Sequence, residues 1–179
     1  MDEKHDQLNS QLALARNNSL AIIKSGLVKR GLELSNEIKK RRVKVLIGDE
    51  PPMGIIGSVI SAYIQKEFLK NYVLKFESWL RCEEIIEHAK KGSVDIFILI
   101  LENIYRSAVS PNIVDRTEMG LKLSSQIKKQ YRKPVIALSG WTEGTYVERA
   151  KSVSDFYFPL PCKLDELKIA FDNCLKFIG

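Results

Sequence analysis

Hydrophobic positions follow two different rhythms along this chain, and the change falls near residue 42. From Gln7 to Ile38, apolar residues recur three, four or seven positions apart, which predicts helix. Residues 17–19 interrupt this pattern, and Ser19 suits an N-cap, so we expect two helices or one kinked helix. The apolar stripe needs cover from either the following domain or a second copy of the chain, and in the second case these helices form a homodimer.

After Arg42, short apolar runs alternate with amphipathic segments. The runs are Val43–Gly48, Tyr72–Glu77, Asp95–Leu101, Pro134–Ser139 and Asp155–Leu160. The amphipathic segments are 53–69, 79–91, 118–131, 145–152 and 164–177. Nearly continuous apolar strands between helices predict a parallel sheet covered on both faces. We therefore expect an α/β fold, with a doubly wound five-stranded sheet in residues 43–179 and a helical extension in residues 1–42.

Composition narrows the class of protein. A chain of 179 residues that is 45% hydrophobic can bury one core and carry an appendage. It contains no run of about 18 uncharged apolar residues, and its polar start does not resemble a secretion signal, so we expect a cytoplasmic protein that does not enter membranes. Three cysteines and two histidines lie far apart, without the spacing of a disulfide framework or a zinc site, and we expect no cofactor.

Positive charge is concentrated in the N-terminal extension. Residues 1–42 hold nine Lys and Arg against five Asp and Glu, and contribute +4 to the net charge of +6. The cluster Lys39–Arg42 suits the C-terminal end of a helix, whose dipole favours cations. Because no aromatic residue interleaves these charges, we do not expect a nucleic-acid partner.

In doubly wound sheets, functional residues gather beyond the carboxyl ends of the strands. Here those ends carry VLIGDEP, VIALSGWT and DFYFPLPCKLDEL. Together with the strand order, these motifs resemble the CheY-like receiver domain of two-component response regulators, over residues 43–178. The resemblance implies an acidic pair that holds magnesium, an aspartate that accepts phosphate in a phosphorelay, a hydroxyl and an aromatic residue that switch, and a lysine before a proline. Such a pocket works by positioning and neutralising charge.

This sequence keeps half of that pocket. Gly48 replaces the first acid of the pair and leaves Asp49, with Glu50 beside it, as a weak metal site or a solvated carboxylate pair. Counted from Asp95, the phosphate acceptor position falls on Ile100, which cannot be phosphorylated. A rival register puts Glu102 there, on the same face of the strand, as a permanent negative charge.

The remaining positions are mixed. Ser139 matches the switch hydroxyl and Tyr157 the switch aromatic. Leu160 stands where the resemblance implies the phosphate-contacting lysine, and Pro161 is a candidate cis proline. Lys163, three residues after Leu160, lies too far along the chain to replace that lysine.

Two segments depart from the family pattern. Residues 103–119 form a long insertion before Gly120, which the resemblance places at the opening of a helix. A loop of this length is usually functional or disordered. Val153 stands where a glycine is common before the fifth strand. Gly54 and Gly57 superficially suggest a phosphate-binding loop, but their spacing matches no nucleotide motif.

These observations predict a degenerate pseudo-receiver. We expect a signalling or regulatory protein-interaction module that works without phosphorylation and is not an enzyme. By resemblance, its partner surface is the fourth helix, fifth strand and fifth helix of the domain. It carries Trp141, with Tyr146, Tyr157 and Lys163. We expect Trp141 to be exposed, either as part of an interface or packed on the local helix. The alternative is an atypical receiver that still binds magnesium and accepts phosphate at another acid. The candidates are Glu50, Glu102 and Asp115.

Overall fold

The computed structural model describes residues 25–26, 29–30, 40–49, 53–104 and 112–178. The chain divides into two compact units, 1–41 and 42–179, one residue away from the boundary that the sequence suggests. Within the first unit, residues 25–26 and 29–30 are helical and exposed. Most of the helical pattern expected between Gln7 and Ile38 lies outside the described residues.

The second unit alternates strands and helices as expected. The strands are β1 (Arg41–Gly48), β2 (Tyr72–Ser78), β3 (Ile96–Ile100), β4 (Val135–Ser139) and β5 (Phe156–Pro159). The helices are α2 (Ile55–Phe68), α3 (Cys82–Lys90), α4 (Ile113–Tyr131), α5 (Thr145–Val153) and α6 (Leu164–Phe177), with a short 3₁₀ turn, η1 (Leu101–Asn103), after β3.

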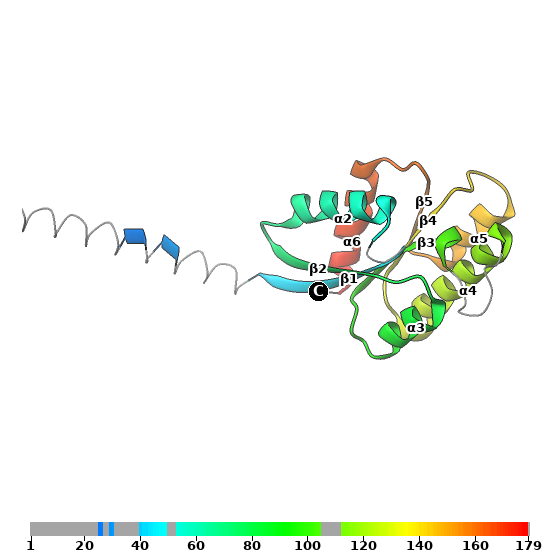
Figure 1. The fold of residues 1–179 in the computed structure, drawn as a ribbon, viewed down its shortest axis with the longest axis horizontal. Helices are drawn as coiled ribbons and strands as arrows, with labels where there is room; N and C mark the ends of the chain where they lie inside the picture. The colour runs from blue at the N-terminus through cyan, green and yellow to red at the C-terminus, as the bar shows by residue number, and fades with distance from the viewer. Residues whose placement is uncertain (1–24, 27–28, 31–39, 50–52, 105–111, 179) are drawn as a thin grey trace, which may run out of the picture. The chain divides into compact units, whose positions relative to one another are not determined.

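The strands form one sheet in the order β2-β1-β3-β4-β5, and the pairs β1–β3, β3–β4 and β4–β5 are parallel. Figure 1 shows α2 and α6 on one side of this sheet and α3, α4 and α5 on the other. This is the flavodoxin-like doubly wound order, in which the chain reverses direction along the sheet after β2. The predicted fold class is therefore confirmed.

Alternate residues of each buried strand supply two hydrophobic cores. In β1 and β3, Val45, Ile47, Ile98 and Ile100 pack under α2 and α6. Leu46 and Leu99 face α3, α4 and α5. Side chains alternate between the faces of a strand, so a strand covered on both sides must be apolar at every position. The unbroken run IFILI of β3, buried at all five positions, meets that requirement.

The long insertion is built differently from the expectation. The sequence suggested a loop over residues 103–119, but α4 begins at Ile113, within it. Asn112 caps the helix: its Oδ1 accepts a hydrogen bond from the Asp115 backbone N–H at 2.9 Å. Gly120 therefore lies inside α4 rather than at its start. Residues 105–111 of the insertion lie outside the described residues.

The turn before β5 contains no glycine, and α5 extends to Val153, the position where a glycine is common. Ser154 Oγ donates to the Ala150 carbonyl at 2.6 Å. Asp155 then ties the turn to β4, since its Oδ2 accepts from the Val135 N–H at 2.9 Å. The Ser154 hydroxyl thus donates to the last turn of α5, and the Asp155 carboxylate satisfies a backbone donor of β4.

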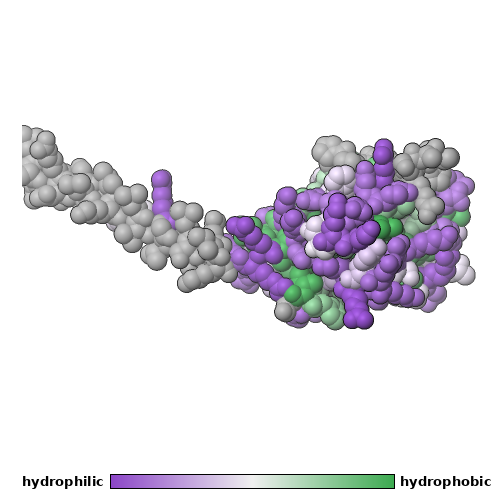
Figure 2. Space-filling model, turned by 90° about the horizontal axis from the view of Figure 1, so that it is seen from below, coloured by the Kyte–Doolittle hydropathy of each residue, from purple (hydrophilic) through white to green (hydrophobic). Residues whose placement is uncertain are grey.

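The face in Figure 2 is mostly hydrophilic, with a narrow hydrophobic strip. Within the part of the chain that the structure describes, no helix is long and apolar enough to cross a membrane.

Candidate functional site

The carboxyl ends of β1, β3 and β4 meet at one edge of the sheet. Gly48 lies beside Leu99, and Ile100 beside Leu138, the residue before Ser139. The strand-end residues singled out in the sequence are therefore brought together, since parallel strands end at the same edge.

Asp49 is buried and engaged rather than solvated. It is 2% exposed, and one carboxylate oxygen accepts a hydrogen bond from the Gly57 backbone N–H at 2.8 Å. The other oxygen accepts from Asn103 Nδ2 at 2.9 Å. The carboxylate thus lies at the N-terminus of α2, where free N–H groups and the helix dipole stabilise an anion. The expectation of a solvated carboxylate pair was wrong for Asp49, and Glu50 lies outside the described residues.

Gly54 and Gly57 make room for this carboxylate. A Cβ atom on Gly57 would lie 2.7 Å from Asp49 Oδ2, and one on Gly54 would lie 2.7 Å from Oδ1. The two glycines that superficially suggested a phosphate-binding loop therefore surround the protein's own anion. The close approach of the carboxylate accounts for glycine at both positions.

Hydrophobic side chains fill the space beside Gly48, where the resemblance implies the first acid of the metal-binding pair. A Cβ atom on Gly48 would lie 3.1 Å from Leu99 Cδ2 and 3.3 Å from Ile104 Cδ1. Leu99 and Ile104 are both fully buried. A carboxylate at position 48 would be desolvated against these side chains, at a cost of several kcal/mol for an unpaired charge. The described residues around Gly48 and Asp49 therefore do not fit a magnesium site.

Ile100 ends β3 and is 2% exposed. Its side chain belongs to the core beneath α2 and α6. It packs as an ordinary core residue and carries no group that could accept phosphate.

Glu102 lies in η1, two residues beyond Ile100, and its carboxylate accepts a hydrogen bond from Ser139 Oγ. The same Ser139 Oγ accepts a hydrogen bond from the Trp141 backbone N–H at 3.1 Å. Ser139 is almost fully buried, and both of these bonds satisfy its hydroxyl. The predicted switch hydroxyl is therefore held by a permanent carboxylate of the same chain.

Tyr157 closes this network from β5. Its hydroxyl donates to the Trp141 carbonyl. Burial raises the pKa of Tyr157 above its ordinary value of 10.0, and the charge of Glu102 acts in the same direction, although the contact with Ser139 opposes it. The phenol therefore stays protonated and able to donate at neutral pH.

Trp141 is half-buried rather than fully exposed, and it packs on the neighbouring helices, which was one of the two alternatives. Its indole Nε1 donates to Thr117 Oγ1 at 3.2 Å, and its ring lies 5.0 Å from that of Tyr146. Thr117 is fully buried in the first turns of α4. The part of the insertion that belongs to α4 is thus hydrogen-bonded, through Thr117, to the loop that follows β4.

A second contact joins α4 to α5. Arg149 makes a bidentate ion pair with Glu118, in which Nη2 lies 2.7 Å from Oε2. The same guanidinium lies 5.8 Å from the centre of the Tyr146 ring. The ion pair lowers the pKa of Glu118 and raises that of Arg149, chiefly through the hydrogen bonds between them. Trp141, Tyr146 and Arg149 consequently form a preorganised surface.

The segment after β5 contains no cation at the position before proline. The Leu160–Pro161 peptide bond is cis, as expected for this candidate. Leu160 is half-buried, and its backbone N–H donates to the Ser139 carbonyl at 2.7 Å. Lys163 is the N-cap residue of α6, and its Nζ lies 3.2 Å from Glu166 Oε1. It is therefore paired along its own helix.

Three contributors were missed at the sequence level, namely Asn103, Ile104 and Thr117. All three lie at the edge of, or within, the segment that was read as an insertion loop. The sequence signal that could have found Thr117 is the Asn112–Asp115 capping pattern, which moves the start of α4 forward. Among the described residues, no group of three or more His, Cys, Asp or Glu side chains could hold a metal ion.

The fold is that of response-regulator receiver domains. The signal receiver domain of an HD domain-containing protein from Pseudomonas fluorescens Pf-5 is similar, with a TM-score of 0.54 and 18% identity over 77% of this chain and 98% of that one. A putative response regulator from Chloroflexus aurantiacus J-10-fl has a TM-score of 0.57 and 12% identity, over 76% and 99% of the two chains.

A two-component response regulator from Clostridium difficile gives a TM-score of 0.54 and 17% identity, over 75% of this chain and 96% of that one. In sequence, no family model and no curated protein matches. The structural likeness establishes the receiver fold, while the chemistry of the pocket must be argued from its own residues.

Proposed function

We propose that this chain is a pseudo-receiver: a signalling or regulatory module that binds a protein partner without accepting phosphate. The observation that carries the proposal is Ile100, the residue that ends β3, which is 2% exposed within the hydrophobic core. A buried hydrocarbon side chain offers no nucleophile to a phosphodonor.

The surroundings of Ile100 support the same proposal. Leu99 and Ile104 occupy the space beside Gly48, and the Asp49 carboxylate is bonded to α2 and Asn103. Phosphoryl transfer depends on a metal ion and positioned cations that neutralise the developing charge. Neither a suitable ligand set nor a lysine before Pro161 is present among the described residues.

The partner surface that we propose is α5, β5 and α6, with the loop after β4. Trp141 and Tyr146 present aromatic surface that is already ordered by Thr117, Glu118 and Arg149. Lys163, whose side chain is 83% exposed, supplies a charge at its rim. An ordered aromatic centre with a polar rim binds at a lower entropic cost than a mobile one.

The first test asks whether the pocket responds to a phosphate analogue. In a Trp79→Phe variant, Trp141 is the sole tryptophan. Its backbone nitrogen lies 3.1 Å from Ser139 Oγ. We expect no fluorescence change on titration with Mg²⁺ and then beryllofluoride. We also expect no phosphoryl mass gain in the wild-type chain treated with acetyl phosphate and Mg²⁺.

A saturable response that Glu102→Gln or Asp49→Asn abolishes would overturn this proposal. It would favour instead an atypical receiver that is phosphorylated at an acidic residue. Peptide mapping of the phosphorylated chain would distinguish Glu50, Glu102 and Asp115.

The second test concerns the partner. Affinity capture with the full chain is compared with capture by Lys163→Glu, on the proposed surface, and by Lys75→Glu, a matched control on β2 whose side chain is 66% exposed. We expect only the first variant to lose the specific partner. Equal loss in both variants would count against the α5–β5–α6 surface.

We further propose a cytoplasmic location and self-association through the N-terminal helices. The support for self-association is the apolar stripe over residues 7–38, which requires a partner surface. Sedimentation of the full chain and of Leu27→Lys would test the dimer, which the substituted chain should lose.

A further inference from the structure

Two clefts meet at the amino end of β5, at the opposite edge of the sheet from the pocket described above. They have volumes of about 400 and 290 Å³, and Phe177 lines both. Phe156, the first residue of β5, lines the larger cleft, and the C-terminal end of α4 lines the smaller one. Trp141 and Lys163 lie beyond the carboxyl ends of β4 and β5. The inference drawn from these clefts therefore does not rest on the proposed function.

Aromatic side chains give the larger cleft an apolar lining. Phe177, the last residue of α6, is 73% exposed, and Phe156 is half-buried. Ile169, Asn173 and Phe177 are four positions apart, so they follow one stripe along α6, and Ile169 is also exposed. An apolar side chain that enters this cleft would remove the exposed phenyl ring from water, which is favourable.

The smaller cleft carries unpaired positive charge. Arg132 and Lys133 line it, and among the described residues their side chains have no ion pair and no hydrogen bond. Lys128 also lines it but is engaged, because its Nζ lies 3.2 Å from Asp155 Oδ1. The other Asp155 oxygen accepts from the Val135 N–H at 2.9 Å. The one carboxylate of the lining is therefore occupied, and two cations remain without a partner.

Helix dipoles reduce this positive charge without cancelling it. α4 ends at Tyr131 and α6 at Phe177, and each C-terminus contributes about half a negative charge. Together they offset about one of the two unpaired positive charges. The Ile127 carbonyl near the end of α4 already accepts from the backbone N–H groups of Arg132 and Lys133. The cleft thus remains attractive to an anion.

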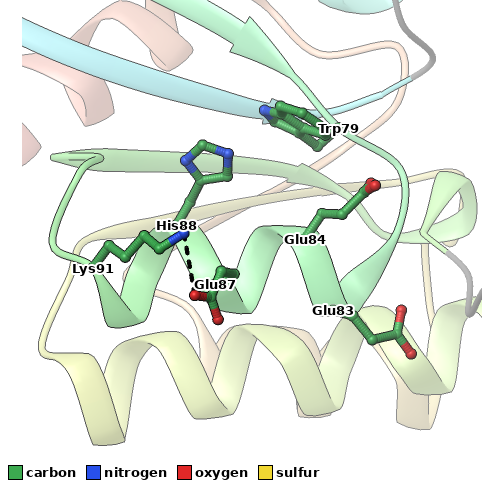
Figure 3. Close-up of a pocket in the computed structure, with 6 residues that line it drawn as sticks. All are labelled: Trp79, Glu83, Glu84, Glu87, His88 and Lys91. Carbon is green, nitrogen blue, oxygen red and sulfur yellow. Dashed lines mark ion pairs between the residues drawn. The ribbon is translucent and has the colours of Figure 1, made fainter.

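The cleft beside α3 differs in this respect. Figure 3 shows Glu87 and Lys91 of that cleft as an ion pair, with 3.2 Å between Nζ and Oε1. Glu84 of the same lining lies 4.0 Å from Arg81. A charged ligand would first have to displace these partners, whereas at the amino end of β5 the free cations have none to displace.

We propose that the two clefts at the amino end of β5 bind an acidic segment of a partner protein that carries an apolar side chain. Carboxylates of the segment pair with Arg132 and Lys133, and the apolar side chain packs against Phe156 and Phe177. The planar guanidinium of arginine can hold a carboxylate through two N–H groups. Because both clefts are lined by Phe177, one short segment reaches the two of them.

The apolar contact is needed to fix the position of the segment. The whole chain carries a net charge of +6, so charge alone would attract an acidic segment to many places. Charge complementarity speeds the encounter, and the burial of an apolar side chain between the phenyl rings then selects this end of the sheet.

The test uses an acetylated, amidated pentapeptide with a central leucine between two pairs of glutamates, and the full chain with isotope-labelled phenylalanine. The chain has seven phenylalanines, and substitution by leucine assigns the amide signals of Phe76, Phe156 and Phe177. We expect the Phe156 and Phe177 signals to shift saturably. The signal of Phe76, on β2 at the other side of the sheet, should stay in place. A peptide with lysines instead of glutamates should shift none of the three.

Two variants separate the charged contact from the apolar one. Exposed ion pairs contribute about 1.4- to 5-fold each to affinity, so Arg132→Gln with Lys133→Gln should weaken binding by about 2- to 25-fold. Phe177→Ala removes apolar surface and should weaken binding by about 3- to 10-fold. Glycine in place of the central leucine of the peptide should weaken binding too, and should make Phe177→Ala nearly silent.

Matched controls come from the opposite edge of the sheet. Arg81 and Lys163 are the exposed N-cap residues of α3 and α6, so Arg81→Gln with Lys163→Gln removes the same charge. Ile55→Ala truncates an apolar side chain that is 86% exposed at the start of α2. The strands between the two edges are four to eight residues long, which is at least about 13 Å. Since salt screens charges more than about 8 Å apart, both controls should leave the affinity unchanged.

Four results would overturn the inference. These are no saturable shift of the Phe156 and Phe177 signals, an equal shift of the Phe76 signal, equal weakening by the control variants, or equal affinity for the glycine peptide, which would indicate a simple anion site. Shifts that follow the concentration of the chain without peptide would also overturn it, since a second copy would then cover the clefts. The remaining phenylalanine signals report whether each variant keeps its fold.

Discussion

The Glu102 carboxylate accepts a hydrogen bond from the hydroxyl of Ser139, 37 positions later in the chain. The contact joins the turn after β3 to the end of β4, beside the buried Ile100. Ser139 in turn accepts from the Trp141 N–H, and the Trp141 carbonyl accepts from Tyr157. A fixed charge at position 102 thus holds the loop after β4 in one arrangement without any added group.

Glu102 and Ser139 should therefore be energetically coupled. We expect Glu102→Gln and Ser139→Ala each to lower the free energy of unfolding, because a hydrogen bond to a charged group contributes about 1.5–3 kcal/mol. Urea denaturation of both single variants and the double variant measures the coupling. If the two losses simply add, the hydrogen bond does not contribute to stability.

Gly57 should not tolerate a methyl group. Alanine inside a helix is normally favoured over glycine by about 1 kcal/mol. At this position we expect Gly57→Ala to destabilise the fold, since the new Cβ would lie 2.7 Å from Asp49 Oδ2. Gly140→Ala is the control, because a Cβ there meets nothing within 4 Å.

The size of the Gly57→Ala effect should depend on Asp49. In an Asp49→Ala background the contact with the carboxylate disappears and only that with the flexible Met53 side chain, at 2.9 Å from Cγ, is closer than 3.0 Å, so Gly57→Ala should destabilise the fold less in urea denaturation. An equal loss of stability in both backgrounds would exclude the Asp49 contact as the cause.

The Glu118–Arg149 ion pair should make stability depend on pH. Arg149 holds the pKa of Glu118 below its ordinary value of 4.5. The unfolded chain therefore binds the proton more readily, so the contribution is present above pH 4.5 and is lost as pH falls through the lowered pKa.

At pH 7 we expect Glu118→Gln to cost at most about 1 kcal/mol, since the Arg149 side chain is 47% exposed and solvent weakens the pair. The difference from wild type, measured by urea denaturation, should shrink at pH 3. Glu166→Gln, in an exposed pair on α6, is the control. A difference that stays constant with pH would contradict the assignment.

Cys174 should resist alkylation in the folded protein. Burial in the core beneath α6 raises its pKa to about 12, so little thiolate is available at pH 8. Cys162 is only half-buried, although burial raises its pKa too. We expect iodoacetamide to modify Cys162 first, and Cys174 only in denaturant, as followed by peptide mass spectrometry. Equal rates in the folded chain would show that the α6 core opens readily.

The fold could be predicted from the sequence because the pattern of hydrophobic residues that indicates it is local and repeated along the chain. A strand covered on both faces is apolar at nearly every position, and β3 satisfies this over all five residues (IFILI) and β4 over its first four (VIAL), before the polar Ser139. The helix start at Ile113 was missed because an exposed cap and an exposed first turn resemble a loop until the Asn112 contact with Asp115 is seen.

The pocket was readable only in part. Gly48, Ile100 and Leu160 depart from the receiver pattern in the sequence itself. That the Asp49 carboxylate accepts from the Gly57 N–H in the first turn of α2, or that Ile104 fills the space beside Gly48, follows from distances that only the folded chain shows.

The sequence by itself thus determined the layered α/β architecture and the apolar residue Ile100 at the end of β3, because both depend on residue type along single strands. Only the tertiary structure decided what the remaining polar groups do. Asp49, Glu102, Ser139 and Tyr157 come from four different segments, and a buried polar group takes whichever partner the packing brings within hydrogen-bonding distance.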